Sequence, residues 1–503
     1  MGVNELIENT GNPEFNIPDE EFYTFLDDID SMSEKPFQFY GFEVNPFSKP
    51  KEWVNISPDR AVDLKSNLLI KSSREKILLK DLLDHLKKNL TSNNVLNNLL
   101  IKGLSGVGKT TILDFFHSFI LKTNKIRERY DLNPYITIKM DFEKLNWNSF
   151  RLDEIRKILE QIDCPNNTVV ILLIDNVVSL AENWENIQKE LDVLEKYFII
   201  GTAKNSEWLY LHDLEERVRT TINFSDNANS VDLGDLIKLQ NLTAFYNSFR
   251  SNIIDIPLWE RNNQLELVEK RLQLFNKSNN LSKDNIFTID KKIKNLVVSL
   301  TYGLPQLSLN LLESIMNKSY ENDPKIHHIN HEVFNTFFSK EELFDLAKTS
   351  ILMQLINNRI QENVSLEIEN IINEMELKKL FLGSEVKKLK NFYEGFKKKT
   401  RKEIIKNLVK SYGAIKLNTG IYPSGDPEEK ITSIQNSIIE GLPIIRSRLT
   451  EAFSGKTKAN STITYHLKAL EPLFKTSKSD DEQIILPNSK FSLAVLETIV
   501  SKY

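Results

Sequence analysis

The chain of 503 residues is 40% hydrophobic and 27% charged, carries a net charge of −5 and holds one cysteine. A chain of this length has room for about three domains, and this balance is typical of a globular protein. One cysteine excludes an internal disulfide framework and favours a reducing compartment. No stretch approaches the roughly 18 apolar residues of a membrane helix, and no secretion signal is seen. We therefore expect a cytoplasmic protein without membrane contact.

Charge is distributed unevenly. The first 34 residues hold ten Asp and Glu and no Lys or Arg, which predicts a disordered acidic head over residues 1–36. The alternative is a short protein-binding segment, anchored by Phe15, Phe22, Tyr23, Phe25 and Leu26. Residues 391–503 hold 18 Lys and Arg against 12 Asp and Glu, an excess compatible with nucleic acid.

Strand and helix patterns alternate from residue 75 to residue 201. Apolar periodicity predicts helices over 75–90, 110–121, 152–162 and 185–196. Strands are predicted over 98–102, 135–141, 169–175 and 197–201. The third of these is a continuous apolar run, typical of a strand buried on both faces. This alternation indicates a parallel α/β sheet.

Strand signals fade after about residue 230. Helices are predicted over 233–248, 265–274, 291–300 and 305–318, followed by a Lys-rich helical stretch over 340–410. Residues 418–427 contain two Gly and two Pro, which indicates a turn-rich linker before a C-terminal unit.

A complete phosphate-binding motif lies between a predicted strand and a predicted helix. The motif reads Gly103-Leu104-Ser105-Gly106-Val107-Gly108-Lys109-Thr110 and matches G-x-x-x-x-G-K-[ST]. Its glycines let backbone N–H groups surround phosphate oxygens, and Lys109 supplies a cation to the β- and γ-phosphates. Thr110 offers its hydroxyl to Mg²⁺, and Thr111 completes the binding set. The motif predicts ATP and Mg²⁺ as cofactors.

A second element is expected to orient the magnesium ion. Asp175 ends the apolar strand over 169–175 and lies 66 residues after Lys109, so it pairs with Thr110 as the predicted metal site. Hydrolytic P-loop proteins usually place a Glu next, whereas this chain has Asn176. An amide can position a water molecule but cannot accept its proton. We therefore predict an ATPase (ATP and water to ADP and phosphate) whose hydrolysis is slow while binding is retained.

These features resemble the AAA+ ATPases. The resemblance begins with the aromatic segment Tyr40–Phe47 and with Ser73-Arg74-Glu75 before a helix, and continues through the phosphate loop and the strand ending at Asp175. It implies that Thr202, after the strand over 197–201, senses the γ-phosphate. It also implies that Arg217, with Arg219 as the alternative, reaches a neighbouring subunit's nucleotide, so that the core self-assembles.

The helical region also resembles an AAA+ lid. The stretch 302–309 is similar to the glycine-containing turn that starts the last lid helix, where many relatives carry an Arg near the position of Gln306. Archaeal origin-recognition initiators with C-terminal winged helices and transposition-regulator ATPases look similar. The predicted parts are the acidic head (1–36), an α/β P-loop core (37–228), a helical lid (229–335), a helical connecting region (336–427) and a winged helix (428–503).

The C-terminal unit is predicted to be a DNA-binding winged helix. Its three helices are expected over 431–439, 444–453 and 461–470, and its strands over 473–475 and 483–486 enclose a wing loop over 476–482. Polar side chains on and before the third helix suit phosphates and base edges. The candidate DNA-binding residues are Lys456, Lys458, Thr462, Thr464, Tyr465 and Lys468. The wing is acidic, which argues against its contact with phosphate.

Two functions therefore compete. The leading hypothesis is an ATP-dependent AAA+ switch that holds double-stranded DNA through its winged helix. The alternative is a nucleotide-gated scaffold or signalling ATPase whose winged helix and acidic head bind proteins. A metabolic kinase is disfavoured by the long helical C-terminal half.

Overall fold

The computed structural model describes the chain in several stretches. The described residues are 36–48, 64, 67–68, 73–91, 96–121, 124–141, 168–209, 211–212, 233–275, 287–301, 303–357, 372–373, 382–396, 444–445, 460–470, 473–479, 482–487 and 495. Outside them lie the acidic head up to residue 35, the predicted helices over 152–162 and 431–439, and the linker over 418–427. Arg217, Arg219, Lys456 and Lys458 also lie outside them. Within the described part, no helix is both long and apolar enough to span a membrane.

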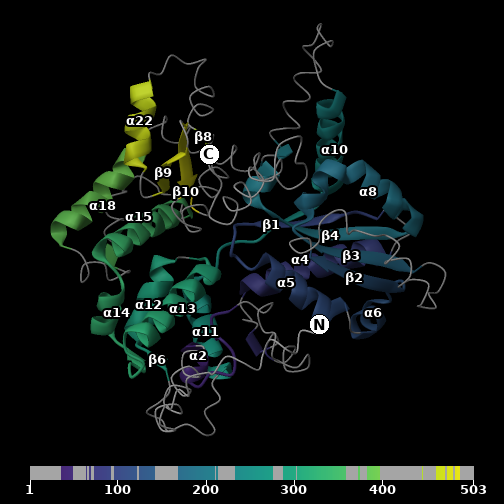
Figure 1. The fold of residues 1–503 in the computed structure, drawn as a ribbon. Coiled ribbons are helices and arrows are strands. Elements are labelled where there is room, and N and C mark those ends of the chain that lie inside the picture. Colours follow the sequence, from purple (N-terminus) through teal and green to yellow (C-terminus); the bar gives the residue numbers. More distant parts are fainter. Residues whose placement is uncertain are drawn as a thin grey trace, which may run out of the picture.

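A five-stranded parallel sheet forms the α/β body (Figure 1). Its strands are β1 (Leu99–Gly103), β2 (Tyr135–Asp141), β3 (Val169–Asp175), β4 (Tyr197–Lys204) and β5 (Ile253–Asp255). They lie in the order β2-β3-β4-β1-β5, and every pairing is parallel. The parallel sheet that the sequence predicts is therefore confirmed.

Helices cover both faces of this sheet. On one face lie α4 (Ser73–Leu90), α5 (Lys109–Phe115) and α6 (Asn124–Tyr130), and on the other lie α8 (Trp184–Leu191) and α10 (Leu233–Phe249) (Figure 1). Side chains of β3 alternate between two cores, because successive strand residues point to opposite faces. Ile171 and Leu173 join the first core, and Leu172 and Ile174 join the second. Burial on both faces explains why β3 is apolar throughout.

The sheet extends further along the chain than the sequence indicates. Ile254 of β5 pairs with Ile101 of β1, and α10 packs on α8 and on the 3₁₀-helix η5 (Val177–Asn183). Both elements lie after residue 228, where the sequence predicts a helical lid. The three residues of β5 are half-buried or exposed at the sheet edge, so they carry no strand periodicity.

The predicted helix over 110–121 changes character midway. It is α-helical as α5 and then a π-helix, η3, over Phe116–Leu121. Phe116 and Leu121 are buried in the first core, which also holds side chains of α4.

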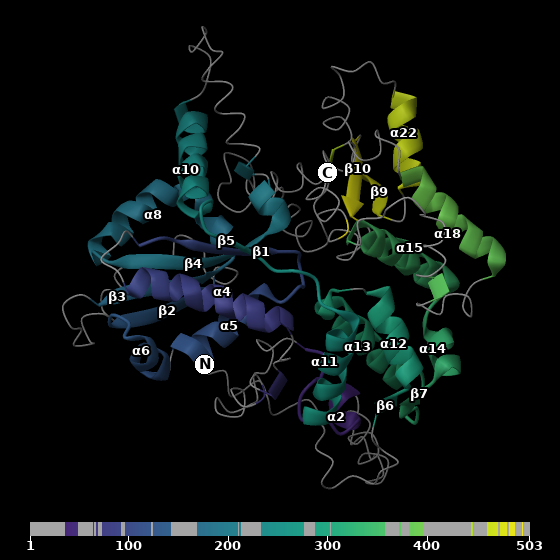
Figure 2. The same ribbon diagram turned by 180° about the vertical axis from the view of Figure 1, so that it is seen from behind.

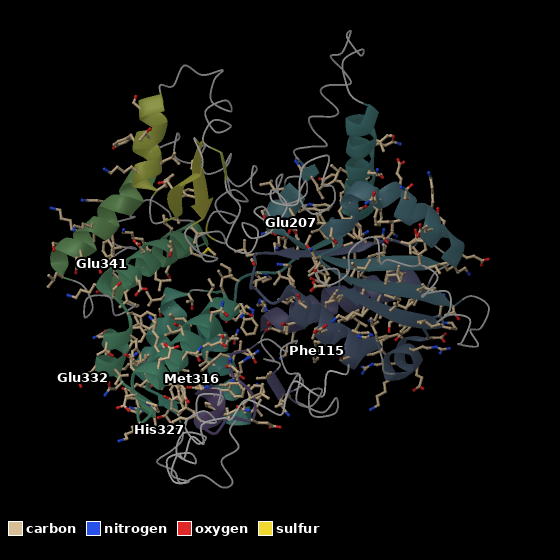
Figure 3. All side chains as sticks on the ribbon, viewed as in Figure 1. Phe115, Glu207, Met316, His327, Glu332 and Glu341 are labelled. Atoms are coloured by element: carbon tan, nitrogen blue, oxygen red, sulfur yellow. The ribbon has the colours of Figure 1, made fainter. Side chains whose placement is uncertain are left out.

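A second, helical body lies beside the sheet (Figures 1 and 2). It contains α11 (Arg261–Leu274), α12 (Lys291–Leu300), α13 (Pro305–Asn322), α14 (His331–Phe337), α15 (Lys340–Asn357) and α18 (Gly383–Phe396), with a short parallel pair of strands, β6 (Thr288–Ile289) and β7 (His328–Ile329). Pro305 occupies the first turn of α13, where its missing N–H costs nothing. Asn330 caps α14 by accepting from Val333 N at 3.0 Å. In Figure 3, Met316 lies among these helices, whereas Phe115 and Glu207 lie in the α/β body.

The aromatic N-terminal segment, residues 40–48, packs against the helical body rather than the sheet. Tyr40, Phe42 and Phe47 are buried in the same core as α12 and α13. Tyr40 Oη donates to Ser319 Oγ at 3.2 Å. Arg271 of α11 donates to the carbonyls of Pro46 and Ser48 at 3.0 and 2.7 Å. This segment, which the sequence assigned to the α/β core, therefore packs into the helical body.

The C-terminal unit differs from the prediction in two places. It contains β8 (Ile444–Ile445), α22 (Asn460–Ala469), β9 (Phe474–Ser479) and β10 (Glu482–Pro487), with the antiparallel order β8-β10-β9. A helix was predicted to start at residue 444, but its first two residues form a strand against β10. The predicted wing loop was too long, because Thr476 pairs with Ile485 and Ser479 with Glu482. Polar side chains suggested a loop, yet the open face of an antiparallel hairpin can carry them, as the exposed Thr476 shows.

Candidate nucleotide-binding site

The phosphate loop lies between β1 and α5, as its sequence predicts. Gly106 and Gly108 have φ values of 78° and 101°, in the left-handed region that other residues avoid. A Cβ at Gly106 would also approach Gln306 Cβ at 3.1 Å. The loop conformation therefore depends on glycine at both positions.

Lys109, Thr110 and Asp175 converge at this loop. Lys109 Nζ donates to the carbonyls of Gly103 and Leu104, at 2.9 and 2.8 Å. Thr110 Oγ1 donates to Asp175 Oδ2 at 2.8 Å, although the two residues are 65 positions apart. The structure thus brings together the two side chains that the sequence proposed as magnesium ligands.

The donor set suits magnesium. A hydroxyl and a carboxylate are hard oxygen ligands, and Mg²⁺ is commonly held by one or two carboxylates together with nucleotide phosphates. In the part of the chain that is described, no three His, Cys, Asp or Glu side chains form a group able to hold a metal by themselves. Thr110 and Asp175 would hold Mg²⁺, which would supply positive charge against the nucleotide phosphates.

Asp175 is also held from the adjacent strand. Thr202 was predicted to follow its strand, but β4 continues to Lys204 and includes it. Its Oγ1 donates to Asp175 Oδ1, and Asn176 N donates to Thr202 Oγ1 at 2.9 Å. Thr202 is buried, with 1% of its surface exposed. The predicted sensor threonine therefore orients the carboxylate that faces Thr110.

Asn176 has an unusual backbone conformation. Its φ and ψ are 59° and 51°, in the left-handed region, where Asn is one of the few non-glycine residues found routinely. It begins the 3₁₀-helix η5 directly after the sheet. The position that usually carries a catalytic Glu therefore suits Asn for conformational reasons as well.

The helical body also contacts the phosphate loop. Gln306, in the first turn of α13, donates its backbone N–H to Gly106 O at 3.5 Å, and its side-chain amide donates to Asn310 Oδ1 at 2.7 Å. Gln306, near whose position many AAA+ relatives carry an Arg, thus contacts the phosphate loop through its backbone, and its amide is directed to its own helix. Tyr302, at the start of the same turn, lies outside the described residues.

Two side chains at the loop were not proposed as site residues from the sequence. Arg74 Nη2 and Trp259 Nε1 both donate to Val107 O, at 3.0 and 2.9 Å. Burial lowers the pKa of the Arg74 guanidinium, and the adjacent Glu75 carboxylate opposes that shift. The Ser73-Arg74-Glu75 motif was a signal for Arg74, whereas nothing in the sequence marks Trp259.

The candidate DNA-binding residues on α22 are on the surface to different degrees. Thr464, Tyr465 and Lys468 are exposed, and Thr462 is half-buried. His466 and Leu467 are buried on the opposite side of the helix. This arrangement matches the polar and apolar faces that the sequence predicts.

The sheet order, the phosphate loop after β1, the carboxylate ending β3 and the adjoining helical lid together define the class of fold. It is an α/β fold of the P-loop type.

No protein-family model matches the chain, and no curated protein matches it. Among solved structures, Aeropyrum pernix ORC2 in ADPNP–ADP complexes aligns over 92% of this chain and 98% of its own, with 11% identity and a TM-score of 0.35. S. cerevisiae Hsp104 bound to ADP aligns over 86% of this chain and 51% of its own, with 13% identity and a TM-score of 0.32. These scores are too low to carry an argument, so the assignment rests on the sheet and the loop.

Proposed function

We propose that the chain is a molecular switch that binds ATP and Mg²⁺ between its α/β body and its helical lid. The observation that carries this proposal is the convergence of Lys109, Thr110 and Asp175 on a glycine-rich loop. The backbone N–H groups of such a loop suit phosphate oxygens. The backbone contact between Gln306 and Gly106 supports a lid that responds to the bound nucleotide. Self-assembly through Arg217 or Arg219 remains part of the proposal.

Slow hydrolysis is the second part of the proposal. Asn176 cannot accept a proton from water, and its neighbours Asp175 and Thr202 are engaged with each other. The switch would therefore stay in its ATP-bound form for long periods.

Replacing Asn176 with Glu tests this point. A general base contributes roughly 10²–10⁴-fold to such reactions. The left-handed backbone costs a Glu about 1 kcal/mol, a factor of roughly 5 in rate, so we expect phosphate release to rise by at least roughly 10-fold, somewhat below the low end of that range. The measurement is steady-state phosphate release, with Asn176→Gln as the control that lengthens the side chain without adding a base. Rapid release by the native chain would contradict the proposal.

DNA binding by the C-terminal unit is the third part. Support comes from the exposed polar face of α22 and from the hairpin β9–β10, which follows the helix as a wing would. The duplex would lie along Thr462, Thr464, Tyr465 and Lys468, with Lys456 and Lys458 before the helix. The competing proposal is that the same face, with Tyr465 57% exposed, binds a protein.

A salt titration separates these two proposals. If Lys456, Lys458 and Lys468 contact phosphates, replacing all three with Ala should make the slope shallower by about 3 in a plot of the logarithm of the DNA association constant against the logarithm of the salt concentration. The measurement is fluorescence anisotropy of a labelled duplex from low to physiological salt. Lys291→Ala with Lys292→Ala, two exposed lysines at the start of α12, is the control. Absence of duplex binding by the native chain, with or without MgATP, would favour the protein-binding alternative.

A further inference from the structure

One backbone carbonyl of the phosphate loop receives two side-chain donors. Arg74 Nη2 reaches Val107 O from α4 at 3.0 Å, and Trp259 Nε1 reaches the same oxygen at 2.9 Å from the linker between β5 and α11. These donors are 33 and 152 positions from Val107 in the chain. Neither side chain is needed to complete the magnesium pair of Thr110 and Asp175, so their convergence calls for a separate explanation.

Arg74 and Trp259 form a connected unit. The Arg74 guanidinium lies 4.9 Å from the centre of the Trp259 ring and makes a buried ion pair with Glu75. Its Nε donates to Pro257 O at 2.9 Å, in the same linker as Trp259. A single guanidinium therefore binds the loop, the linker and a carboxylate at once. This requires the several fixed donors of an arginine, which a lysine lacks.

Holding the Val107 carbonyl also fixes the next N–H group. The peptide bond is planar and trans, so the N–H of Gly108 points opposite to the C=O of Val107. Gly108 has a φ of 101° and, as a glycine, could rotate this peptide at little cost. The two donors therefore set the direction of an N–H group within the phosphate-binding motif.

The same tryptophan is joined to the lid. Trp259 N donates to Gly303 O at 3.1 Å, and Gly303 N donates to Gln264 Oε1 of α11 at 3.1 Å. Gly303 has a φ of 72°, and a Cβ there would come within 2.8 Å of Leu258. The turn before α13 is thus tightly fitted to the linker, so that a displacement of the lid acts on Trp259 and through it on the loop.

We propose that Arg74 and Trp259 are positioning residues of the phosphate loop, holding the Val107–Gly108 peptide in its nucleotide-binding orientation and coupling it to the lid. This proposal rests on nucleotide binding as the proposed function and adds the connection by which the bound nucleotide changes the lid. Binding of phosphate to the loop stabilises the peptide orientation that keeps Trp259 in place, and Trp259 in turn orders the turn at Gly303.

The experiment compares two Trp→Phe variants of the full chain. Trp259→Phe removes the donor to Val107, whereas Trp184→Phe removes a comparable donor, the Trp184 Nε1 bond to Ser248 Oγ at 3.0 Å on the far face of the sheet. Isothermal titration with MgATP should show roughly 3–10-fold weaker binding for Trp259→Phe, the loss expected for one hydrogen bond, and less than about 2-fold change for Trp184→Phe.

Hydrogen exchange of the lid provides the readout that a merely structural role would not change. In the native chain and in Trp184→Phe, saturating MgATP should slow exchange in α11 and α13. In Trp259→Phe this slowing should be lost even when the nucleotide site is saturated. Arg74→Lys should weaken MgATP binding as well, and the double variant should lose less than the product of the two single effects, because both donors share one acceptor.

Two outcomes overturn different proposals. If the native chain binds MgATP and Trp259→Phe matches Trp184→Phe in both affinity and lid protection, the positioning role is wrong while nucleotide binding stands. If the native chain binds no MgATP, the proposed function itself fails, and the positioning role with it.

Discussion

Replacing Lys109 with Ala is expected to weaken MgATP binding by roughly 100-fold, the equivalent of one or two charge-assisted hydrogen bonds to phosphate. Lys109 Nζ lies across the loop, bound to the carbonyls of Gly103 and Leu104, so its cation is already held where phosphates would bind. Isothermal titration of the full chain measures the loss directly. Thermal unfolding measures it independently, because a ligand at 100 times its Kd stabilises a protein by about 2.7 kcal/mol.

The matched control is Lys294→Ala. Lys294 is a lysine of α12 whose amine lies 3.2 Å from Glu269, in the lid and away from the loop. The Lys294→Ala variant should bind MgATP like the native chain. The unfolding midpoint of Lys109→Ala without nucleotide should also be native-like, because water can satisfy the carbonyls of Gly103 and Leu104 once the amine is removed. Unchanged MgATP affinity in Lys109→Ala would contradict the assignment of the loop.

The loop and its metal pair could be predicted because their signals are local. Eight consecutive residues specify the loop, and one apolar run specifies the strand that carries Asp175 to the same sheet edge. Parallel strands present their carboxyl ends together, so the meeting of Thr110 with Asp175 follows from the strand assignments alone.

Contacts that depend on strand register could not be predicted. Ile174 pairs with Gly201 in the β3–β4 ladder, which places the next residues, Asp175 and Thr202, side by side. Over the residues that pair, 170–174 and 197–201, no alternation of polar and apolar side chains fixes the relative shift of the two strands. The sequence could name Thr202 as a site residue but could not identify its partner.

Long-range packing explains the remaining differences. Residues 40–48 precede the sheet in sequence, yet their aromatic side chains complete the core of helices that follow more than 200 residues later. Trp259 is separated from Val107 by 152 positions and follows a short edge strand without periodicity. Neither relation leaves a pattern within a local window of sequence, because each joins residues that lie far apart in the chain.

Replacing Asp175 with Asn should remove the magnesium dependence of ATP binding. The substitution keeps the shape of a residue that is 9% exposed and removes the charge that would face the metal. We expect MgATP affinity to fall by roughly 10–100-fold, as for loss of a charged ligand, toward the affinity for ATP with a chelator present. The measurement is a pair of ATP titrations, with Mg²⁺ and with excess EDTA. Asp255→Asn is the control, since Asp255 also ends a strand of this sheet but pairs with Lys102 at 3.1 Å.

Asp175→Asn also distinguishes a metal ligand from a purely structural residue. Both carboxylate oxygens accept hydrogen bonds, from Thr110 and from Thr202, and the Asn side chain has one acceptor oxygen and one donor NH₂. One of the two threonine hydroxyls can turn to accept from this NH₂, so the network survives and the fold is retained. If Asp175 has only a structural role, Asp175→Asn leaves the ratio of ATP affinities with and without Mg²⁺ unchanged. If Asp175 is a metal ligand, the substitution brings that ratio close to one. A native-like ratio in Asp175→Asn would mean that magnesium is held elsewhere, and Thr110 alone could not then account for a metal site at this loop.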